Sequence, residues 1–289
     1  MKCHLTCRCR PPNESHKQQM STRSFPVWFV DAFTDTLFRG NPAAVVALKD
    51  RWLPDRQLQA IASEINLSET AFFLPGQDPI PLRWFTPLLE VPLCGHATLA
   101  TALVVRDGFM RLPPDEDIVF DTASGKLKVS GKPGRFILDF PARSTVTSDM
   151  SLATMSAIVG APVLELFESV DRYVCVLADA TAVRGLSPDL SAIARLPLPG
   201  LIMTAPDGND AFVSRYFAPA KGVAEDPVTG TSHCTLAPFW GARLGSNPIL
   251  GRQVSARSGE ILCRCERDRV FLEGSGRLFL QGQINVPDS

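Results

Sequence analysis

Residues 83–87 read RWFTP, and residues 215–219 read RYFAP. Each copy is followed by an acidic residue and then by a glycine-led run of small and apolar residues, which starts at Gly95 in the first half and at Gly230 in the second. One short match can arise by chance. Here the aromatic motif and the glycine-led run recur in the same order, half a chain apart, which indicates duplication. The sequence therefore predicts two similar domains.

Each copy is expected to place the start of a helix behind an aromatic strand. Aromatic residues favour strands and Pro ends them, and the apolar run at residues 97–105 is long enough for a buried helix. In the second copy, Thr229 and Thr231 are good N-cap residues. Unpaired amides at a helix start can hold carboxylate oxygens. Two facing starts predict one anion-binding cleft, and ordinary capped core helices are the alternative.

The rest of the chain mixes strands with a few helices. Alternating or β-branched patterns predict strands at residues 27–33, 44–48, 71–74, 118–121, 127–130, 135–139, 173–177, 201–204 and 270–273. Apolar residues at helical spacing predict helices at residues 54–65, 152–159 and 190–195. Because strands do not alternate regularly with helices, as parallel-sheet folds require, the sequence predicts an α+β fold.

Turn-rich sequence near residues 130–145 sets the expected domain boundary. We expect an N-terminal domain at residues 24–138 and a C-terminal domain at residues 139–289, whose last strand could return to the first domain. Residues 1–23 are polar and basic and are expected to be a disordered or non-native leader. They lack the apolar segment of a secretory signal, so a cytoplasmic location is expected.

Composition excludes several classes of partner and cofactor. The 29 Lys and Arg residues balance 30 Asp and Glu residues, and no run of like charges forms a tail, so nucleic acid and anionic membrane surfaces are not expected as partners. Apolar runs are far shorter than the roughly 20 residues of a membrane-spanning helix. The scattered cysteines indicate free thiols. Nucleotide-binding and HExxH motifs are absent from the sequence, so neither a cofactor nor a metal is predicted.

Three titratable residues lie where proton-transfer chemistry is plausible. Glu69 lies between a predicted helix and an apolar strand, where desolvation would raise its pKa toward neutrality. His96 follows Gly95 at a helix start, where the dipole favours a neutral ring. Asp226 lies in the matching loop of the second copy and could pair with Glu69 as a second proton carrier. The alternatives are a helix-junction salt bridge, a structural histidine and an Asp-Pro turn.

Two further residues at the predicted helix starts carry reactive or polar groups. Thr231 offers a hydroxyl for a substrate carboxylate, although capping alone would also explain it. Cys94 is a thiol directly before Gly95, where a thiolate would be stabilised and could act as a base. Its counterpart in the second copy is Thr229, so a thiol on each face of a substrate carbon is not available.

Several ordered motifs resemble those of the phenazine-biosynthesis (PhzF-like) family, within the diaminopimelate epimerase-like superfamily. The likeness spans about residues 25–286 and rests on the motifs at residues 30–34, 40–45, 66–72, 83–87, 90–100 and 225–230. The resemblance implies two similar domains, each a β-barrel-like sheet around a central helix, with the active site between them and commonly a homodimer.

By this resemblance, Glu69 corresponds to the acid/base of the family, His96 to a residue that contacts substrate or relays the proton, and Asp226 to a second catalytic group. Gly95, Gly230, Thr231 and Asn41 are expected to bind substrate, the last because it lies in the matched motif at residues 40–45. The family often has Ser at the position of Thr231, and the hydroxyl is retained.

The sequence thus predicts an isomerase that moves a proton on a small cyclic, amino or hydroxy acid without a cofactor. An amino-acid epimerase or racemase that uses Cys94 is the nearest alternative, weakened by Thr229 in the second copy. A non-catalytic protein that binds small molecules or a partner in the same cleft is the other.

Overall fold

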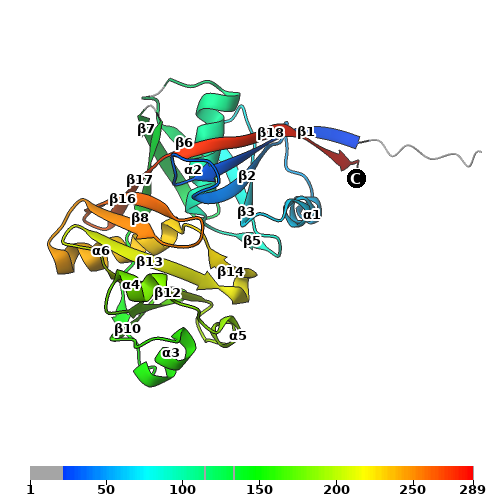
Figure 1. Ribbon diagram of the computed structural model, residues 1–289. Coiled ribbons are helices and arrows are strands. Elements are labelled where there is room, and N and C mark those ends of the chain that lie inside the picture. Colours follow the sequence, from blue (N-terminus) through cyan, green and yellow to red (C-terminus); the bar gives the residue numbers. More distant parts are fainter. Residues whose placement is uncertain (1–21, 114, 133, 289) are drawn as a thin grey trace, which may run out of the picture.

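The computed structural model describes residues 22–113, 115–132 and 134–288, arranged in two parts (Figure 1). The upper part in Figure 1 is built mainly from the first half of the chain, and the lower part mainly from the second half. Strand pairing continues from one part to the other through β8 (Arg135–Pro141) and β17 (Arg269–Gly274), which are antiparallel neighbours.

The upper part is a curved sheet around one buried helix. Its strands are β1 (Thr22–Ala32), β2 (Asn41–Ala47), β3 (Glu69–Phe73), β4 (Ile80–Phe85), β5 (Glu90–Val91), β6 (Ile118–Thr122) and β7 (Gly125–Lys132), with β18 (Gly276–Pro287) at the outer edge beside β1. All residues of α2 (Gly95–Leu103) are buried, and it packs against β1, β2, β3, β8 and β18. A π-helical turn, η1 (Val104–Phe109), continues it. This helix is the apolar run predicted from the sequence.

Helix α1 (Asp55–Ile65) covers an outer face of the same sheet. It buries Leu58 and Ala62 against β3 and β4, as its apolar spacing predicts. The helix ends where Asn66 takes a left-handed conformation with φ of 55°, a common way to close a helix. That turn leads the chain directly into Glu69 at the start of β3.

The lower part has a second sheet around a second buried helix. Its strands are β9 (Val146–Thr147), β10 (Glu165–Ser169), β11 (Arg172–Val176), β12 (Gly200–Pro206), β13 (Ala211–Ala218), β14 (Val223–Asp226), β15 (Ile249–Gln253) and β16 (Gly259–Glu266). Helix α6 (Gly230–Leu244) packs against β13, β15, β16 and β17. The outer helices are α3 (Leu152–Val159), α4 (Ala180–Arg184) and α5 (Leu190–Ile193), and a single 3-10 turn forms η2 (Pro219–Lys221).

The two sequence copies adopt the same local structure. Arg83 on β4 makes a two-pronged ion pair with Glu90, at 2.7 and 2.6 Å, and Arg215 on β13 does the same with Glu225, at 2.7 and 2.8 Å. Each guanidinium also lies about 5 Å from the ring of the aromatic residue two positions later, 5.1 Å and 5.0 Å from the centroid. The acidic residue of each copy therefore serves to hold a strand pair together ahead of the glycine-led helix.

The observed architecture is a mixed α/β fold, with parallel pairs such as β2–β3 and β11–β12 among antiparallel ones. Thr22 and Arg23 belong to β1, so the expected leader is too long by two residues, while residues 1–21 lie outside the described part of the chain. The boundary expected between residues 138 and 139 falls inside β8, and β18 pairs with β1 along its length. Within the described residues no helix is long and apolar enough to cross a membrane.

Candidate active site

A cavity of about 310 Å³ opens where the starts of α2 and α6 meet. Six of the residues proposed from the sequence line it, contributed by β3, by the strand β14 and by both helix starts: Glu69, Gly95, His96, Asp226, Gly230 and Thr231. The fold therefore brings together residues that are up to 162 positions apart, as the duplicated cleft requires.

The two helix starts touch each other backbone to backbone. A Cβ atom placed on Gly95 would lie 3.3 Å from the Cα atom of Gly230, and a Cβ atom on Gly230 would lie 3.3 Å from the Cα atom of Gly95. Neither N-cap residue, Cys94 or Thr229, bonds the amides of its own helix through its side chain within the described structure. The positive ends of both helices therefore face the same cavity, where they favour an anion.

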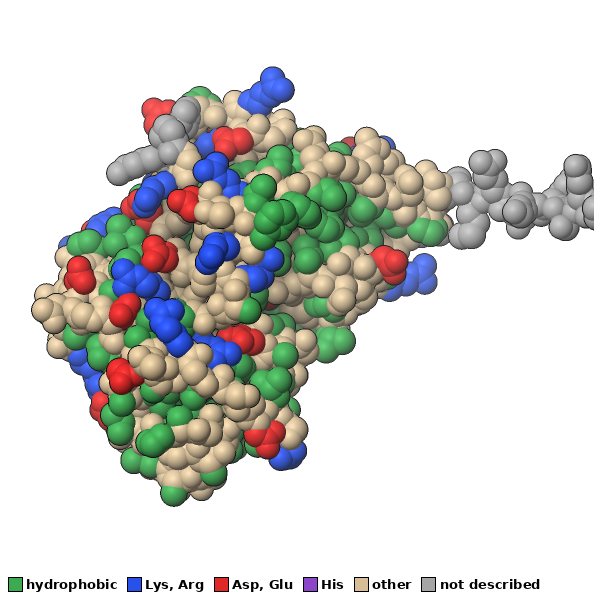
Figure 2. Space-filling model, viewed as in Figure 1, with side chains coloured by type: hydrophobic (Ala, Val, Ile, Leu, Met, Phe, Trp, Pro, Cys, Tyr) green, Lys and Arg blue, Asp and Glu red, His purple; other side chains and the backbone are tan. Residues whose placement is uncertain are grey.

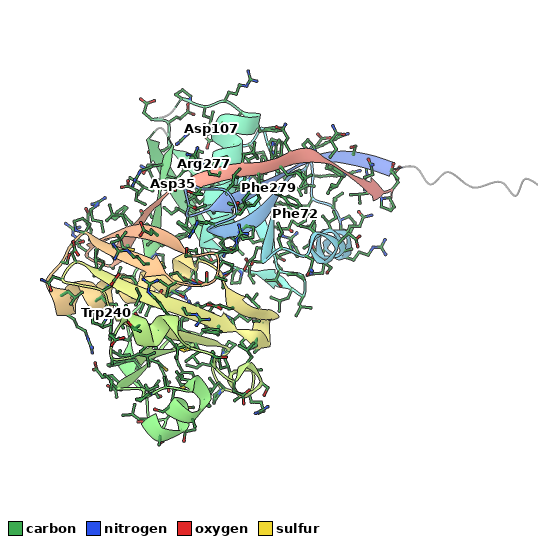
Figure 3. All side chains as sticks on the ribbon, viewed as in Figure 1. Asp35, Phe72, Asp107, Trp240, Arg277 and Phe279 are labelled. Carbon is green, nitrogen blue, oxygen red and sulfur yellow. The ribbon has the colours of Figure 1, made fainter. Side chains whose placement is uncertain are left out.

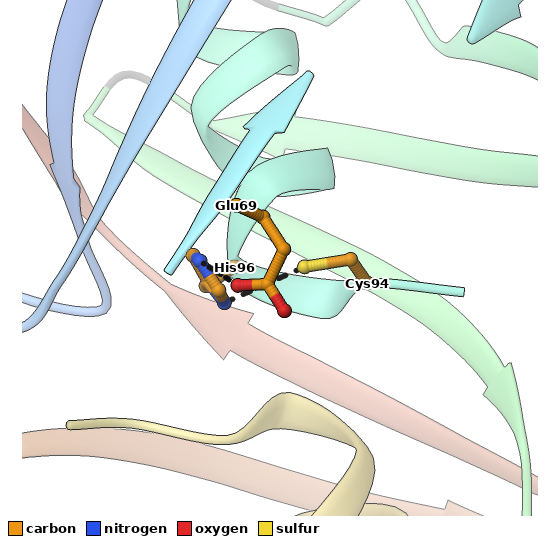
Figure 4. Close-up of side chains that lie close together, drawn as sticks. All are labelled: Glu69, Cys94 and His96. Atoms are coloured by element: carbon orange, nitrogen blue, oxygen red, sulfur yellow. Dashed lines mark hydrogen bonds and ion pairs between the residues drawn. The ribbon is translucent and has the colours of Figure 1, made fainter. Parts of the chain in front are cut away.

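Glu69, His96 and Cys94 form a compact group of side chains (Figure 4). A carboxylate oxygen of Glu69 lies 3.1 Å from Nε2 of His96, and the Cys94 sulfur lies 3.5 Å from Nδ1 of the same ring. Glu69 is 15% exposed, so it reaches the cavity, whereas the imidazole is only 3% exposed. A proton on the ring can thus be exchanged with a group that meets substrate.

The ionisation of this group differs from the sequence prediction in two respects. Burial raises the pKa of Cys94 to about 11, and the charge of Glu69 adds to the effect, so the thiolate predicted at the helix start is wrong. Burial alone would lower the pKa of His96, but its contacts with Cys94 and Glu69 outweigh burial and raise this pKa well above its usual value. This direction is opposite to the one that the helix dipole predicts, which favours a neutral ring.

Asn41 acts behind the cavity rather than in it. Its side chain is completely buried, and its amide nitrogen lies 3.0 Å from Nδ1 of His96, 2.7 Å from Oδ1 of Asp226 and 2.9 Å from the carbonyl oxygen of Val228. Asn41 does not line the cavity, and its contact with substrate stays a prediction. Because β2 of one part carries the amide and β14 of the other carries the aspartate, Asn41 positions both catalytic candidates across the junction.

Asp226 is buried and bonded on both carboxylate oxygens. One accepts the Asn41 amide, and the other accepts the hydroxyl of Thr229 in a very short hydrogen bond. Burial raises the pKa of Asp226 to about 6, His96 and the two donors oppose this, and the nearby Glu69 adds to it. The pKa of Asp226 therefore lies within about one unit of neutrality, as the pKa of a group that both gives and accepts a proton should.

A family model described as phenazine biosynthesis-like protein, PhzC-PhzF, matches residues 30–282. The chain belongs to the PhzC-PhzF family. An uncharacterized isomerase of Pseudomonas aeruginosa is 45% identical over 259 residues, covering 89% of this chain and 97% of that protein. The mouse phenazine biosynthesis-like domain-containing protein 2 is 38% identical, covering 90% and 99%.

Solved structures agree with this membership. A PhzF-family protein from Enterococcus faecalis superimposes with a TM-score of 0.84 at 40% identity, covering 91% of this chain and 99% of that one. A hydroxyproline epimerase of Agrobacterium vitis superimposes with a TM-score of 0.60 at 12% identity, covering 92% and 94%. The second likeness shows that the two chains share a fold.

Glu69, Cys94 and His96 are also the described residues whose ligand atoms lie close enough for a metal ion, all within 4.8 Å. In this PhzC-PhzF protein, however, Nε2 of the ring faces Glu69 and Nδ1 faces Cys94. The arrangement is suited to passing a proton through the imidazole, and the absence of a metal remains a prediction.

Four charged residues of the cavity wall were missed by the sequence analysis. Asp171 accepts from Nε of Arg172 at 2.7 Å and from Nζ of Lys221 at 2.6 Å, and Nη1 of Arg143 lies 3.5 Å away. All four line the cavity. Adjacent opposite charges at positions 171 and 172, directly before a buried apolar strand, were the available signal, because a charge at a buried strand end needs a partner.

Proposed function

We propose that this protein is an isomerase that moves a proton between carbon atoms of a small anionic acid without a cofactor. The observation that carries the proposal is the position of Glu69, whose carboxylate reaches the cavity at the paired helix starts and lies 3.1 Å from Nε2 of His96. A carboxylate that meets substrate in a largely buried site, beside an imidazole that can exchange a proton with it, can act as a general base.

The proposed reaction begins with the carboxylate of the substrate at the amide ends of α2 and α6. Glu69 takes a proton from a carbon made acidic by that carboxylate or by a neighbouring alkene. The C–H electron pair moves into the conjugated system, and the resulting negative charge is stabilised by the helix starts and by His96. A proton then returns to a different carbon from Glu69 or from Asp226, which restores the original number of protons on substrate and protein.

Relatives support the class of reaction. Two proteins of Pseudomonas aeruginosa, 45% and 42% identical to this chain, are named isomerases, although their substrates are not established by those names. Both align over about 90% of this chain, which includes the whole cavity.

Deuterium incorporation tests the proposal. Cyclic amino and hydroxy acids are incubated with the protein in heavy water, and exchange at carbon is followed by NMR. Glu69→Gln should lower exchange by about 10²–10⁴-fold, because the general base is lost. Glu64→Gln removes an exposed carboxylate from α1 and is the matched control. Full exchange by Glu69→Gln, in a variant that melts like the native protein, would show that Glu69 is not the base.

Epimerisation through Cys94 is the second candidate, favoured by the 3.5 Å approach of its sulfur to the imidazole. Such an enzyme would use a thiol on one face of a carbon and Glu69 or Asp226 on the other. Cys94→Ala separates the two candidates, since the proposed isomerase keeps most of its exchange and the epimerase loses it.

We further propose that the protein is a homodimer. Three consecutive apolar side chains of β18, Leu278, Phe279 and Leu280, are 41–51% exposed, and Phe38 packs edge-on against Phe279. Figure 2 shows hydrophobic side chains gathered over this strand, and Figure 3 labels Phe279 upon it. An exposed apolar stretch of this kind supports contact with a second copy. Sedimentation equilibrium should give twice the chain mass, reduced to one chain mass by Phe279→Ser.

A further inference from the structure

The wall that the lower part contributes to the cavity has an excess of positive charge. Arg143 follows β8, Arg172 begins β11, and Lys221 ends η2. All three approach one carboxylate, that of Asp171. We call Arg143, Arg172 and Lys221 the cationic cluster. Within the described residues, its three positive charges face the single negative charge of Asp171, so two positive charges are left over.

Arg172 is fixed in place by neutral groups as well. Its Nη1 lies 3.2 Å from the hydroxyl of Thr231 and 3.1 Å from that of Ser232, and the guanidinium lies 4.8 Å from the centre of the Tyr216 ring. The side chain is almost completely buried. Because Thr231 and Ser232 are in the first turn of α6, the cationic cluster is joined rigidly to the helix start that is proposed to hold a carboxylate.

Arg143 is less well satisfied than Arg172. The one side-chain acceptor that its guanidinium has among the described residues is Asp171, at 3.5 Å. Burial lowers the pKa of Arg143, and repulsion from Arg172 lowers it further. The Arg143 side chain is only 18% exposed and faces the cavity, so an anion placed there would stabilise its guanidinium.

The opposite composition is found on the wall contributed by the upper part. There Glu69 supplies a negative charge beside His96, and Leu89, Val91 and Leu93 supply apolar surface. The cavity is thus polarised, with a base on one wall and surplus cations on the other. A substrate whose only charge lies at the helix starts would leave the extra positive charge of the cationic cluster without a partner.

We infer that the substrate carries a second anionic group, bound by Arg143, Arg172 and Lys221, in addition to the carboxylate at the helix starts. The inference rests on the proposed function for the position of the first carboxylate. The substrate class is a compact dianionic acid, either a dicarboxylic acid or an acid with a phosphate group. Asp171 is then a positioning residue that holds the three cations in one place between turnovers.

Rigid aromatic acids measure this preference directly. Isothermal titration compares benzoate, which has one charge, with isophthalate and terephthalate, which have two at different separations, and with 3-carboxyphenyl phosphate. At least one dianion should bind about tenfold or more tightly than benzoate, as a charge-assisted contact of a second anion implies. Whether a second carboxylate or a phosphate binds better identifies the second group. Equal affinities for benzoate and all dianions would overturn the inference.

Lys221→Met supplies the residue-level test, because it removes one half-buried cation of the cationic cluster and leaves the Asp171–Arg172 pair in place. The preferred dianion should weaken at least threefold while benzoate changes little. Lys126→Met, which removes an exposed charge from β7 outside the cavity, is the matched control. Equal weakening of benzoate, or an equal effect of Lys126→Met, would show that the cluster does not select a second anion.

The same titrations in Glu69→Gln keep this inference separate from the proposed reaction. If Glu69→Gln still prefers dianions, the cationic cluster binds a second anion even when deuterium exchange proves independent of Glu69. If Glu69→Gln loses exchange but the native protein shows no preference for dianions, the proposed reaction is supported and the second anion site is rejected.

Discussion

Adding a single methyl group at Gly95 tests whether the two helix starts are held by direct backbone contact. The new Cβ atom of Gly95→Ala would lie 3.3 Å from the Cα atom of Gly230 and 3.6 Å from a ring carbon of Phe140. Carbon atoms in contact prefer about 3.5–4.0 Å. One helix start must therefore shift by a few tenths of an ångström, and neither can yield by rotating a side chain.

The expected cost follows from two opposing effects. Forcing an extra carbon into a packed site costs about 1–3 kcal/mol, whereas replacing Gly by Ala within a helix normally gains about 0.5–1 kcal/mol. The free energy of unfolding should therefore fall by about 1–2 kcal/mol in Gly95→Ala. Gly108→Ala is the control, because its Cβ atom would meet ordinary contacts at 3.6 and 4.0 Å and should leave stability unchanged or slightly raised.

Urea unfolding at 25 °C measures both variants, and a double-mutant cycle sharpens the result. Once Gly95→Ala has moved the helices apart, Gly230→Ala should cost less than it does alone, so the double variant should lose less than the sum of the single losses. Additive losses, or a gain in Gly95→Ala equal to that of Gly108→Ala, would refute direct contact. Deuterium exchange should also fall in Gly95→Ala, because a small misplacement of catalytic groups lowers rate.

Three further outcomes are expected. Burial lowers the pKa of His233 from 6.5 to about 4, so the stability that its neutral ring confers is complete above pH 6.5. About 3 kcal/mol of that stability is lost as pH falls toward 4. Urea titrations across this range should show the loss, and His233→Asn should make the free energy of unfolding depend less steeply on pH. Asn41→Ala should lower kcat by about 10²-fold with little change in KM and displace the pH profile of exchange, because Asp226 and His96 lose their shared amide; an unshifted profile would indicate a purely structural role. Arg215→Met should lower the free energy of unfolding by about 1–3 kcal/mol and Arg83→Met by less than about 1 kcal/mol, because the ion pair of Arg215 is the more buried. Thermal or urea melts measure both variants, and equal losses would contradict this explanation.

The repeat and the apolar periodicity of the chain were sufficient to predict the helices that form the site. The run after Gly95 and the spacing in α1 are local properties, and the structure places both helices within a residue or two of the prediction. A last strand that returns to the first domain was expected, but the bounds of β18 were not predicted. Most of its side chains are exposed, so no alternation of apolar and polar residues marks either face. Its position is set by pairing with β1, which lies about 250 residues earlier in the chain.

The site was predicted where a residue type alone implies chemistry and was missed where contact decides the role. His96 and Asp226 are titratable residues of the repeated segments, Glu69 is one at a predicted helix-strand junction, and all three reach the cavity. The charge on His96 depends on a carboxylate from another element, and the placement of Asn41 depends on a bond between the two parts, so neither follows from local sequence. The cationic cluster joins three distant segments and has no counterpart in the first copy.

The contact between Gly95 and Gly230 also constrains how substrate can enter. Two bare backbones in contact cannot approach further, and the Asn41 bridge resists their separation, so a rigid opening of the molecule would turn about this point as a fulcrum. Atoms close to a pivot point are displaced little by a rotation, whereas atoms far from it are displaced more. Admission of a ligand would thus widen the outer rim near Lys221 while leaving the distance between Glu69 and the helix starts almost constant.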